Sequence, residues 1–519
     1  MLNSYVSPSG NIKIDSLLDG ARWGIPSDSS TDLTFSFPSN FFTSDYSNNI
    51  EFTSGWSGLN NLQQYNAELA LAAWAELVNV TFVKVSDSVS DYGDIRFVYS
   101  DAVSGDVAAW SYTPSTGYIR GDSLMSTDAT GDVWINPDVD NLNFGTYGYS
   151  TLIHELGHAL GLKHPFEVEG LFPAINSAYD DTHYSIMSYT AYEGAGYVFE
   201  DNGSSYSYWV KQPVTPMLHD ILAMQYIYGA NMSTRTGDDI YVFAQDAELK
   251  TIWDAGGNDT FDVSNQLTGV HVSLIAGTFS DIGYRQQTPY GPKVSAEENI
   301  AIAYGVVIEN ITGSNYDDIL IGNDFDNIIF GGLGSDNIDG GLGNDIAKFI
   351  GNLSDYLIDG TLDNTLVVGT NNRDTLVNIE YLQFNEQLYS VDSLLNGASG
   401  VQSAVPTQQS EVDFAPDEGT FAYFLLEIGN PISVDASVNY ATRDGSANAG
   451  VDYVATRGIA TINAGETFTI IEVEILHDDL IEGDETFYLA VTDPQNGGFE
   501  DSDIELLAQR TIGDLDLFG

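Results

Sequence analysis

The sequence predicts a multidomain chain of the α+β and all-β classes: a first domain with a mixed sheet and helices, then a parallel β-roll, then a C-terminal β-sandwich. Three features of the sequence lead to this prediction. Helical and strand-like spacings alternate over residues 1–232, a nine-residue glycine and aspartate repeat follows, and short alternating strands separated by turns fill residues 411–519. The length of 519 residues agrees with about three domains of ordinary size.

Acidic residues far outnumber basic ones. The 75 Asp and Glu against 16 Lys and Arg give a formal net charge of −59, which excludes a nucleic-acid binder that neutralises phosphates and argues against docking on anionic membranes. The apolar share of 43% is sufficient for packed cores.

The chain has no cysteine, so disulfides, thiolate metal sites and cysteine nucleophiles are excluded. Bound metal is then the obvious cross-link for an extracellular protein.

No stretch of the sequence is apolar for long enough to span a membrane, so no membrane insertion is expected. The first eleven residues have neither the basic region nor the apolar core of a secretory signal. Three alternatives follow: a signal that was removed, export directed from elsewhere in the chain, or an intracellular protein.

Residues 1–232 form the predicted mixed α/β domain. Apolar residues recur at helical spacing over residues 62–77, and a second helix is expected over residues 151–161. Thr215 followed by Pro216 has the pattern of an N-cap and a first helical residue, so a third helix is expected to begin there. The apolar positions of the first helix are Leu62, Tyr65, Leu69, Ala72, Ala73 and Leu77. Strand-like alternation occurs over residues 81–85, 94–100 and 133–136.

The sequence HELGHALGLKH, which begins at His154, has the pattern HExxHxxGxxH. His154 and His158 are four residues apart, so on a helix both imidazoles face one side and can bind the same zinc ion. Glu155 is placed to take a proton from water there as general base. Gly161 lets the chain leave the helix through a positive φ angle, so that His164 supplies the third nitrogen. Three protein ligands leave an open position, as in catalytic zinc sites.

A repeat with a nine-residue period begins at Gly313 and restarts at residues 322, 331 and 340. The later units follow GGxGxD, the pattern of a parallel β-roll in which glycines permit tight turns and the aspartate offers a hard oxygen ligand to calcium. Turns stack at intervals of 18 residues, so the turn at 313 is expected over the turn at 331. Tyr316 and Phe325 replace a glycine in the first two units, and Asn327 replaces the aspartate, so weaker or empty half-sites are expected there. The expected ligands, counting turn carbonyls, are Asp318, Asn327, Gly331, Gly334, Asp336, Gly340, Gly343 and Asp345.

The remaining chain divides into a cap, a linker and the last domain. Ordinary alternation returns over residues 351–395, which are expected to cap the open end of the roll, so the roll with its cap extends over residues 233–395. Residues 396–410 are rich in Gly, Ser and Gln and are expected to be a linker. The strands expected in the sandwich cover residues 421–427, 434–442, 459–462, 467–476 and 486–491.

The motif at His154 is followed by Ser185-Ile186-Met187-Ser188-Tyr189, and the two together resemble the serralysin-type metzincin peptidases. In that family the methionine of this Met-turn lies beneath the zinc ion as an apolar floor. The tyrosine ligates zinc at rest and swings away to hydrogen-bond the oxyanion. The resemblance assigns these roles to Met187 and Tyr189. Further segments also resemble a serralysin catalytic domain: residues 14–24, 33–38, 108–114, 131–136 and 215–231. Two of them, 108–114 and 131–136, resemble the edge-strand region along which the substrate backbone pairs in that family.

The resemblance extends to a calcium site at the start of the roll. The stretch from RTGDDIY to WDAGGNDTFD matches the serralysin calcium pattern, with carbonyl and carboxylate ligands. A glutamate in GVVIEN would reach back to a neighbouring ion. The ligands that the resemblance implies are Arg235, Gly237, Asp239, Asp254, Gly256, Gly257, Asp259 and Glu309.

Residues 411–519 resemble a Calx-β domain, through the segments at 438–453, 461–491 and 510–516. That family binds calcium at one end of the sandwich. Leu515 interrupts the usual acidic cluster at the end of the domain. A calcium-stiffened spacer or binding module and a passive fold both remain open. The matching calcium positions are Glu418, Asp452, Asp478, Asp479, Glu482, Glu485, Asp514 and Asp516.

Together these features predict a secreted, zinc-dependent endopeptidase with one catalytic zinc ion and several structural calcium ions. The alternative is a calcium-stabilised adhesion or scaffold protein with a vestigial peptidase site. The resemblance implies protein or peptide substrates, a proteinaceous inhibitor as a second kind of partner, and a monomer. It also implies a bacterial, extracellular protein exported by a type I-like route.

Overall fold

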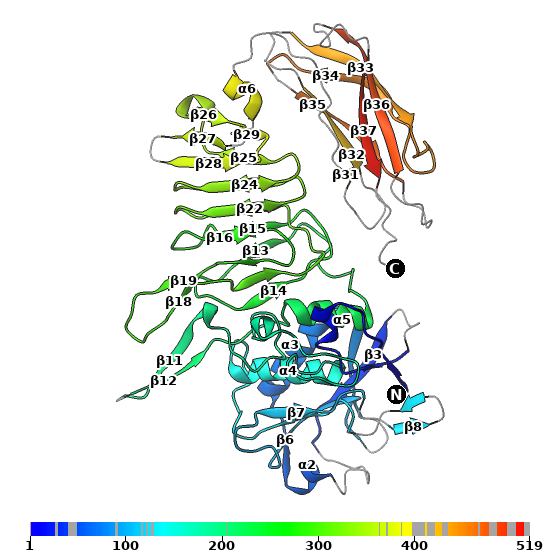
Figure 1. Cartoon of the computed structure of the whole chain (residues 1–519), viewed down its shortest axis with the longest axis vertical. Helices are drawn as coiled ribbons and strands as arrows, with labels where there is room; N and C mark the ends of the chain where they lie inside the picture. Colours follow the sequence, from blue (N-terminus) through cyan, green and yellow to red (C-terminus); the bar gives the residue numbers. More distant parts are fainter. Residues whose placement is uncertain are drawn as a thin grey trace. The chain divides into compact units, whose positions relative to one another are not determined.

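The structure is a computed structural model (Figure 1). It divides into two compact units, Met1–Ile308 and Glu309–Gly519, so the boundary falls within the residues predicted as roll. None of the described helices has the length and apolar character needed to cross a membrane. The residues that it describes are 2–25, 30–39, 49–88, 92–115, 118–120, 123–125, 129–203, 205–362, 364–369, 372–385, 387–396, 411–412, 421–427, 434–465, 468–476, 485–495 and 505–512.

A six-stranded sheet lies in the first unit and contains the three predicted strands. It is made of β3 (Thr31–Ser36), β4 (Trp56–Gly58), β5 (Val80–Lys84), β6 (Ile95–Ser100), β7 (Ala109–Ser111) and β10 (Val133–Ile135). The strand order is β5-β3-β6-β10-β7, with β4 paired to β6. The neighbours from β5 to β10 are parallel, whereas β7 is antiparallel to β10 and forms an edge. Parallel strands buried on both faces are mostly apolar, and β6 and β10 are buried at every position, with Arg96 and Ser100 as the polar residues of β6.

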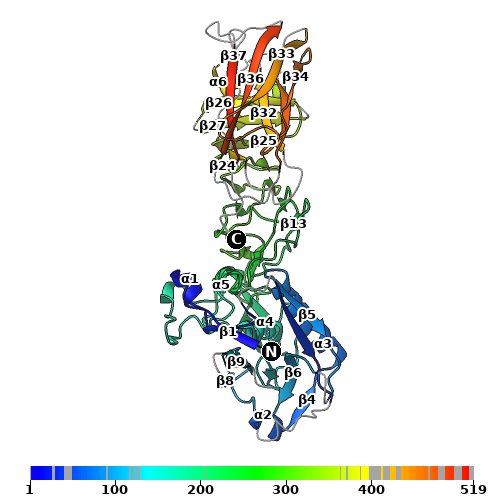
Figure 2. The ribbon, with the colours of Figure 1, turned by 90° about the vertical axis from the view of Figure 1, so that its right-hand side faces the viewer.

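Two long helices, α3 (Asn61–Ala75) and α4 (Tyr147–Leu160), pack against each other and against this sheet (Figure 2). The predicted face of α3 was wrong in part, because Leu62 and Tyr65 are exposed. The small side chains of Ala67 and Ala70 face inward instead and let α4 approach closely. Trp74 is fully buried at this contact, where its indole Nε1 donates to the carbonyl of Ile153 on α4 at 3.1 Å.

The third helix, α5 (Leu218–Tyr228), begins later than predicted. Its N-cap is Met217 and not Thr215. The side chain of Asp220 explains the start, because its Oδ2 accepts from the backbone nitrogen of Met217 at 2.8 Å. An acceptor in the first turn satisfies a backbone donor that the helix itself leaves unpaired.

The other elements of the first unit are short. Its smaller sheets have the orders β2-β1-β9-β8, β11-β12, β14-β20-β17 and β18-β19, and β13 pairs in parallel with β15. The elements are β1 (Leu2–Tyr5), α1 (Ile12–Asp15), β2 (Ala21–Trp23), α2 (Ile50–Thr53), β8 (Tyr118–Arg120), β9 (Ser123–Met125), β11 (Tyr197–Asp201), β12 (Tyr206–Val210), β13 (Ile240–Val242), β14 (Lys250–Ile252), β15 (Thr260–Asp262), β16 (His271–Ser273), β17 (Phe279–Ser280), β18 (Tyr284–Arg285), β19 (Val294–Ser295) and β20 (Ile300–Ile302).

The second unit begins with the predicted parallel roll. Its rungs are β21 (Asn310–Thr312), β22 (Ile319–Asn323), β23 (Ile328–Phe330), β24 (Asn337–Gly341) and β25 (Ile346–Phe349) (Figure 1). The expected 18-residue stacking is confirmed, since Ile319 pairs with Asn337 and Ile328 pairs with Ile346. The inward side chains of successive rungs form the core: Leu320, Ile329, Ile338 and Ala347 are all buried.

The residues predicted to cap the roll pair with its last rungs. They form β26 (Leu357–Thr361), β27 (Asn364–Val368), β28 (Arg373–Val377), β29 (Tyr381–Phe384), β30 (Gln387–Ser390) and α6 (Val391–Asn396). Strand β28 pairs in parallel with β24, and β29 pairs in parallel with β25. The cap therefore continues both columns of the roll before the chain turns antiparallel.

The C-terminal strands form the predicted sandwich. One sheet has the order β31-β37-β36-β33-β34, and β32 pairs with β35 in the other. Phe424, Tyr453 and Phe487 are buried between them, and Tyr453 stacks on Phe487 with 4.4 Å between ring centroids. The strands are β31 (Glu411–Val412), β32 (Phe421–Glu427), β33 (Ala436–Asp444), β34 (Arg457–Ile462), β35 (Phe468–Glu474), β36 (Glu485–Gln495) and β37 (Glu505–Ile512); β31 and β37 were not predicted.

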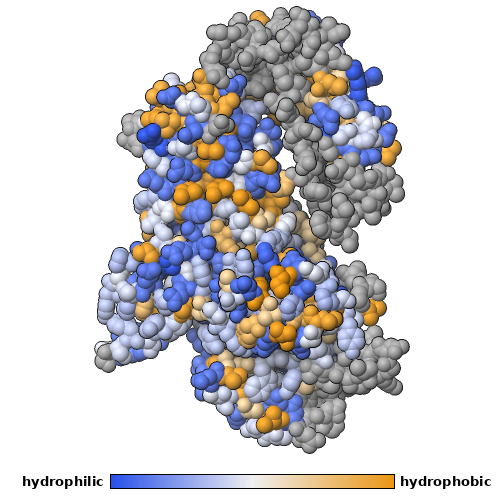
Figure 3. All heavy atoms as spheres, in the orientation of Figure 1, coloured by the Kyte–Doolittle hydropathy of each residue, from blue (hydrophilic) through white to orange (hydrophobic). Residues whose placement is uncertain are grey.

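The face of the described surface drawn in Figure 3 is mostly hydrophilic. On the face drawn in Figure 3, hydrophilic side chains are spread over the described residues, and apolar residues occur in small groups between them. A solvated surface of this kind favours solubility through net charge.

Candidate active site

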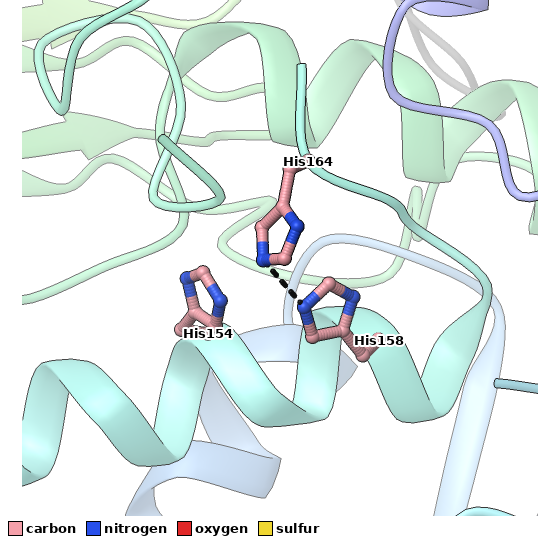
Figure 4. A group of neighbouring side chains, drawn as sticks. All are labelled: His154, His158 and His164. Atoms are coloured by element: carbon pink, nitrogen blue, oxygen red, sulfur yellow. Dashed lines mark hydrogen bonds between the residues drawn. The ribbon is translucent and has the colours of Figure 1, made fainter. Parts of the chain in front are cut away.

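Helix α4 positions the first two histidines of the motif. Thr146 caps its N-terminus, since the Thr146 hydroxyl accepts from the backbone nitrogen of Tyr149 at 3.4 Å. Most of the helix is buried, so its orientation is fixed by packing. His154 and His158 lie one turn apart on one side of this helix, as the spacing predicts (Figure 4).

Gly161 ends the helix and brings His164 back to the other two rings. Its φ is 114°, in the left-handed region that favours glycine. A methyl group at this position would lie 2.5 Å from the carbonyl oxygen of Ala21, so a larger residue would clash. The three imidazoles converge (Figure 4), with ligand nitrogens within 4.8 Å of one another and 3.0 Å between the Nε2 atoms of His158 and His164.

The outward nitrogens of the rings contact protein oxygens. His154 Nδ1 lies 2.8 Å from the carbonyl of Ile186, and His158 Nδ1 lies 2.8 Å from the carbonyl of Leu162. A carbonyl can only accept, so each Nδ1 carries the proton and each Nε2 offers a lone pair. Burial lowers the pKa of His154 to about 4, so this ring is neutral at pH 7. Neutral imidazoles with inward lone pairs are the ligands that zinc requires, so the donor set fits this ion.

The third histidine has a carboxylate behind it. His164 Nδ1 lies 3.1 Å from Glu167 Oε1. Carboxylate contacts of this kind orient a ligand ring and make it more basic. Glu167 was not among the predicted site residues, since nothing in the motif requires an acid at that position.

Glu155 lies beside the histidines with an unusual environment for a carboxylate. It is 4% exposed, and its Oε2 has no hydrogen-bond partner among the residues that the structure describes. Burial raises the pKa of Glu155 to about 8. A buried carboxyl group with a raised pKa is suited to exchange a proton with a reacting group.

Met187 packs beneath the helix that carries the histidines. Its side chain is fully buried. A methyl group at Gly157 would lie 2.5 Å from the Met187 sulfur, so glycine between the two helical histidines leaves the space that this sulfur fills. The structure thus brings the predicted Met-turn and the predicted zinc helix into direct contact.

Tyr189 stands at the open side of the three rings. Its side chain is 70% exposed, and its ring centroid lies 4.5 Å from that of His164 and 5.8 Å from that of His154. Partial burial and then the charge of Glu155 raise the pKa of Tyr189 to about 12. The hydroxyl is therefore protonated at neutral pH and available as a hydrogen-bond donor.

Asp220 is a buried residue of the site that sequence reasoning missed. Its carboxylate accepts from the Ser185 hydroxyl at 2.6 Å and from the Ile186 backbone nitrogen at 2.7 Å, in addition to Met217. Ile186 in turn supplies the carbonyl that faces His154 Nδ1. Asp220 thereby links the start of α5 to the Met-turn and, through it, to His154. The only signal in the sequence was an acid in a first helical turn, which is common.

We expect Asp220→Ala to lower the free energy of unfolding by about 3 kcal/mol, because three buried donors lose their acceptor. Zinc affinity should fall by about 10-fold to 100-fold, because the Ile186 carbonyl is no longer held toward His154. Chemical denaturation and a competitive zinc titration measure the two effects. The exposed control Asp106→Ala should change neither, and an Asp220→Ala protein with parental stability would contradict this role.

The edge strand of the sheet lies near the site. Strand β7 contacts α4, and its outer edge is unpaired among the described strands. An extended peptide can add to such an edge through backbone hydrogen bonds. This agrees with the predicted place for substrate along residues 108–114.

The predicted calcium ligands at the start of the roll also converge. Asp239, Asp254 and Asp259 have carboxylate oxygens within 4.8 Å of one another. Asp254 accepts from the hydroxyl of Tyr241, and Asp259 Oδ1 accepts from the Asp239 backbone nitrogen at 2.7 Å. The other predicted ligands lie in the turns around these aspartates. Positive φ angles occur there at Arg235, Gly256 and Gly257, and not at Gly237.

The carboxylates of the GGxGxD units form two regular columns. Asp336 Oδ1 accepts from the Asp318 backbone nitrogen at 2.9 Å, and Asp345 Oδ1 accepts from the Asn327 backbone nitrogen at 2.8 Å. Gly334 and Gly343 have φ angles of 119° and 122°, as the tight turns demand. Each repeat glycine also lies close to the glycine 18 residues later. A methyl group at Gly313 would lie 2.2 Å from the carbonyl oxygen of Gly331, and a methyl group at Gly322 would lie 2.1 Å from that of Gly340.

Asn327 differs from the aspartates of the roll. Its amide oxygen accepts from the Asn323 backbone nitrogen at 2.8 Å, and its Nδ2 donates to the carbonyl of Glu309 at 3.0 Å. An amide carries no charge and here has its hydrogen bonds within the protein. A weaker half-site in the second unit stays a prediction.

The predicted calcium positions of the sandwich are only partly within the described residues. Asp452 is 9% exposed and accepts from the Asn448 backbone nitrogen at 2.6 Å. Glu485 opens β36. The others lie outside the described residues: Glu418, Asp478, Asp479, Glu482, Asp514 and Asp516.

Comparisons with known proteins agree with this geometry. Residues 59–188, which include the histidines and the Met-turn, match the Matrixin family model. Residues 227–399 match the Peptidase M10 serralysin C terminal model. Serralysin C of Dickeya chrysanthemi is 34% identical over 52% of this chain and 55% of its own length. Metalloprotease AprA of Pseudomonas entomophila is 32% identical over 59% of this chain and 62% of its own length.

The chain is similar to the serralysins over little more than half of its length. It spans little more than half the length of these relatives. Residues 404–514 of this chain match the Calx-beta domain model. The apo-form Calx CBD1 domain is 29% identical, with 18% of this chain and 83% of that one covered and a TM-score of 0.17, which is too low to support an argument about the fold.

Proposed function

We propose that the chain is a zinc-dependent endopeptidase that hydrolyses peptide bonds in proteins, and that its roll folds on binding calcium. The observation that carries the proposal is the convergence of three imidazoles around one point, beside a buried carboxylate with an unpartnered oxygen. Relatives named serralysin and metalloprotease support it. A vestigial site would have no reason to keep the whole set.

His154, His158 and His164 would hold the ion, which when bound supplies Lewis-acid chemistry that polarises a carbonyl and acidifies water. A cation held by the three histidines would lower the raised pKa of Glu155 again and keep its carboxylate charged. Glu155 then accepts the proton of the attacking water through its Oε2 and later gives it to the leaving amine. The Tyr189 hydroxyl donates to the oxyanion of the tetrahedral intermediate. The edge of β7 holds the substrate backbone in an extended form.

Zinc content tests the metal assignment apart from catalysis. We expect one zinc ion per chain after dialysis against zinc and gel filtration, measured by atomic emission. His158→Ala should lose it, because two imidazoles bind far more weakly than three. His271→Ala, a partly exposed histidine outside the site, should keep the parental content. Equal zinc in the parent and in His158→Ala would refute the assignment.

The carboxylates of the roll support a calcium-dependent fold. Burial, with the neighbouring Asp374 as a smaller cause, raises the pKa of Asp336 to about 8. Burial and the neighbouring Glu380 likewise raise the pKa of Asp345 to about 8. Charged carboxylates are costly in this environment until a cation compensates them, so calcium binding would be coupled to folding.

This coupling predicts an inverted pH dependence for the calcium-free protein. A carboxyl whose pKa is higher in the folded state binds more protons when folded, so stability falls as pH rises from about 4 to about 8. Thermal unfolding of the roll, followed from pH 5 to pH 8 without calcium, should show a decreasing midpoint. Millimolar calcium should remove most of this decrease, and a calcium-free midpoint that rises with pH would contradict it.

Secretion follows from the same proposal. Calcium sites of moderate affinity would be empty in a cytosol and filled outside a cell. We therefore propose an extracellular, bacterial protein that acts as a monomer on protein substrates. The proposal also includes export by a type I-like route and control by a proteinaceous inhibitor. Only the resemblance to the serralysins supports these two parts.

A further inference from the structure

Helix α2 buries its acid and exposes its isoleucine. Glu51 is 2% exposed, whereas Ile50 beside it is 64% exposed. This reverses the ordinary preference, since a glutamate is almost never fully buried unless it is paired. A buried carboxylate is costly without hydrogen-bond donors, so the partners of Glu51 indicate what it holds in place.

The partners of this carboxylate lie on the edge strand of the sheet. Glu51 Oε1 accepts from the indole Nε1 of Trp110 at 3.0 Å and from the hydroxyl of Tyr112 at 2.5 Å. Burial, and then the hydrogen bond to Glu51, raise the pKa of Tyr112, so its hydroxyl stays protonated and remains a donor. Trp110 lies in β7 and Tyr112 directly follows it, so one oxygen holds two side chains of the same edge.

Both donors belong to a cluster of apolar side chains that joins α2, β4 and β7 to the sheet. The buried members are Val98, Val103 and Trp134, and the partly buried ones are Phe52, Trp56, Trp110, Tyr112 and Ala129. The backbone carbonyl of Glu51 also accepts from the Ser100 hydroxyl at 2.6 Å, so α2 is fixed to β6. Hydrogen bonds away from water are electrostatically stronger, so this carboxylate ties the edge strand firmly to a fixed element.

The segment that the carboxylate holds leads from the sheet to the three histidines. The pairing of β7 with β10 ends at Ser111. The carbonyl of Tyr112 then accepts from the Gly131 backbone nitrogen at 2.8 Å. Pro114 lies beside the end of α4, since a methyl group at Gly161 would be 3.9 Å from Pro114 Cγ. Tyr112 is therefore on the short path between the sheet and the helix that carries the first two histidines.

We propose that Glu51 is a positioning residue for substrate: it holds the edge of β7 in the orientation in which an extended peptide pairs with it. The inference rests on the proposed endopeptidase function and concerns a residue outside the reacting centre. Pairing needs fixed directions for the backbone donors and acceptors of the edge, and an edge that is held in advance binds with less loss of entropy. The effect of Glu51 should therefore grow with the length of substrate that lies along β7.

Glu51→Ala and Glu51→Gln in the full chain, loaded with zinc and calcium, test this role. Alanine removes the acceptor of both donors, whereas the amide oxygen of glutamine can still accept from them. The matched control is Asp15→Ala, which removes a buried acid from α1, another helix of four residues. Asp15 accepts from the backbone nitrogens of Ser9 and Gly10, at 2.6 and 2.9 Å, and not from β7.

Two quenched peptides with the same residues at the cleaved bond are compared, a short one and one extended by several residues on each side. We expect Glu51→Ala to raise KM for the long peptide by about tenfold and to change kcat by less than about twofold, because uniform binding is lost. The advantage of the long peptide over the short one in kcat/KM should fall by the same factor. Glu51→Gln should keep most of the parental advantage, and Asp15→Ala should keep all of it.

An unchanged advantage of the long peptide in Glu51→Ala would overturn the inference and leave the endopeptidase function intact. An equal loss in Asp15→Ala would also overturn it, because general loosening of the domain would then be the cause. A parent that cleaves neither peptide would instead refute the proposed function.

Two further measurements keep the inference testable. If Glu51→Ala does not fold, Tyr112→Phe removes one donor but keeps the ring, and it should lower the long-peptide advantage by about threefold. Binding without cleavage is measured with the labelled long peptide and Glu155→Ala, alone and combined with Glu51→Ala. Kd should rise by about tenfold in the combined variant. An equal Kd, or an unchanged advantage in Tyr112→Phe, would contradict the role of Glu51.

Discussion

Glu155→Ala should reduce peptide hydrolysis by about 10³-fold or more while leaving one zinc ion bound. The side chain is buried beside the three histidines, and its Oε2 is free to take a proton. Alanine removes this base without touching the imidazoles, so binding of zinc and of substrate should persist. Turnover of a quenched peptide and zinc content, measured on the same preparation, test both statements.

Two controls make the result specific. Glu68→Ala removes an exposed glutamate on α3 that pairs with Lys84, and it should keep parental turnover. Zinc retained in Glu155→Ala excludes a collapsed site as the cause of lost activity. A Glu155→Ala protein that cleaves at near the parental rate would mean that another group acts as the base.

Tyr189→Phe should lower kcat by about 10²-fold and leave KM nearly unchanged. The hydroxyl is expected to donate to an oxyanion that exists only along the reaction path, so its loss affects the transition state more than substrate binding. The ring itself stays, which preserves the contacts with His154 and His164. Steady-state kinetics on one peptide substrate give both constants.

The outcome that would contradict this role is a raised KM with an unchanged kcat, since that would place Tyr189 in ground-state binding. Tyr65→Phe is the control for loss of a tyrosine hydroxyl. Its side chain is exposed on α3, away from the residues of the site. It should match the parent in both constants.

The convergence of the three histidines could be predicted because the information is local. The i, i+4 spacing of His154 and His158 fixes their common side on a helix, and Gly161 fixes the return of the chain. The positions that escaped prediction depend on contacts between distant segments. Asp220 supports the Met-turn across 34 to 35 residues of sequence, and no periodicity reveals such a link.

The same distinction explains the errors in the helices. Apolar spacing indicated that α3 is a helix but favoured Leu62 over Ala67 and Ala70 for the buried face. Close packing on α4 decided otherwise, since small residues let two helices approach. For α5, Thr215 and Pro216 offered a local start signal, and the Asp220 side chain placed the cap at Met217 instead.

The roll shows where a repeat pattern stops being informative. The 18-residue stacking could be predicted for the GGxGxD units, and the structure agrees. The carboxylate columns continue through Asp374 and Glu380 without a fixed period, because an inserted segment separates these residues from the repeat. Only the backbone register reveals that they occupy the next rung.

The most direct test of a zinc endopeptidase is hydrolysis of unfolded casein in millimolar calcium, with one portion stripped by a zinc-selective chelator and then supplied with zinc again. Activity should disappear on stripping and return on addition of zinc, with calcium present throughout. A folded, zinc-loaded chain that does not cleave casein would contradict the account, and an adhesion or scaffold protein with a vestigial site would become the better explanation.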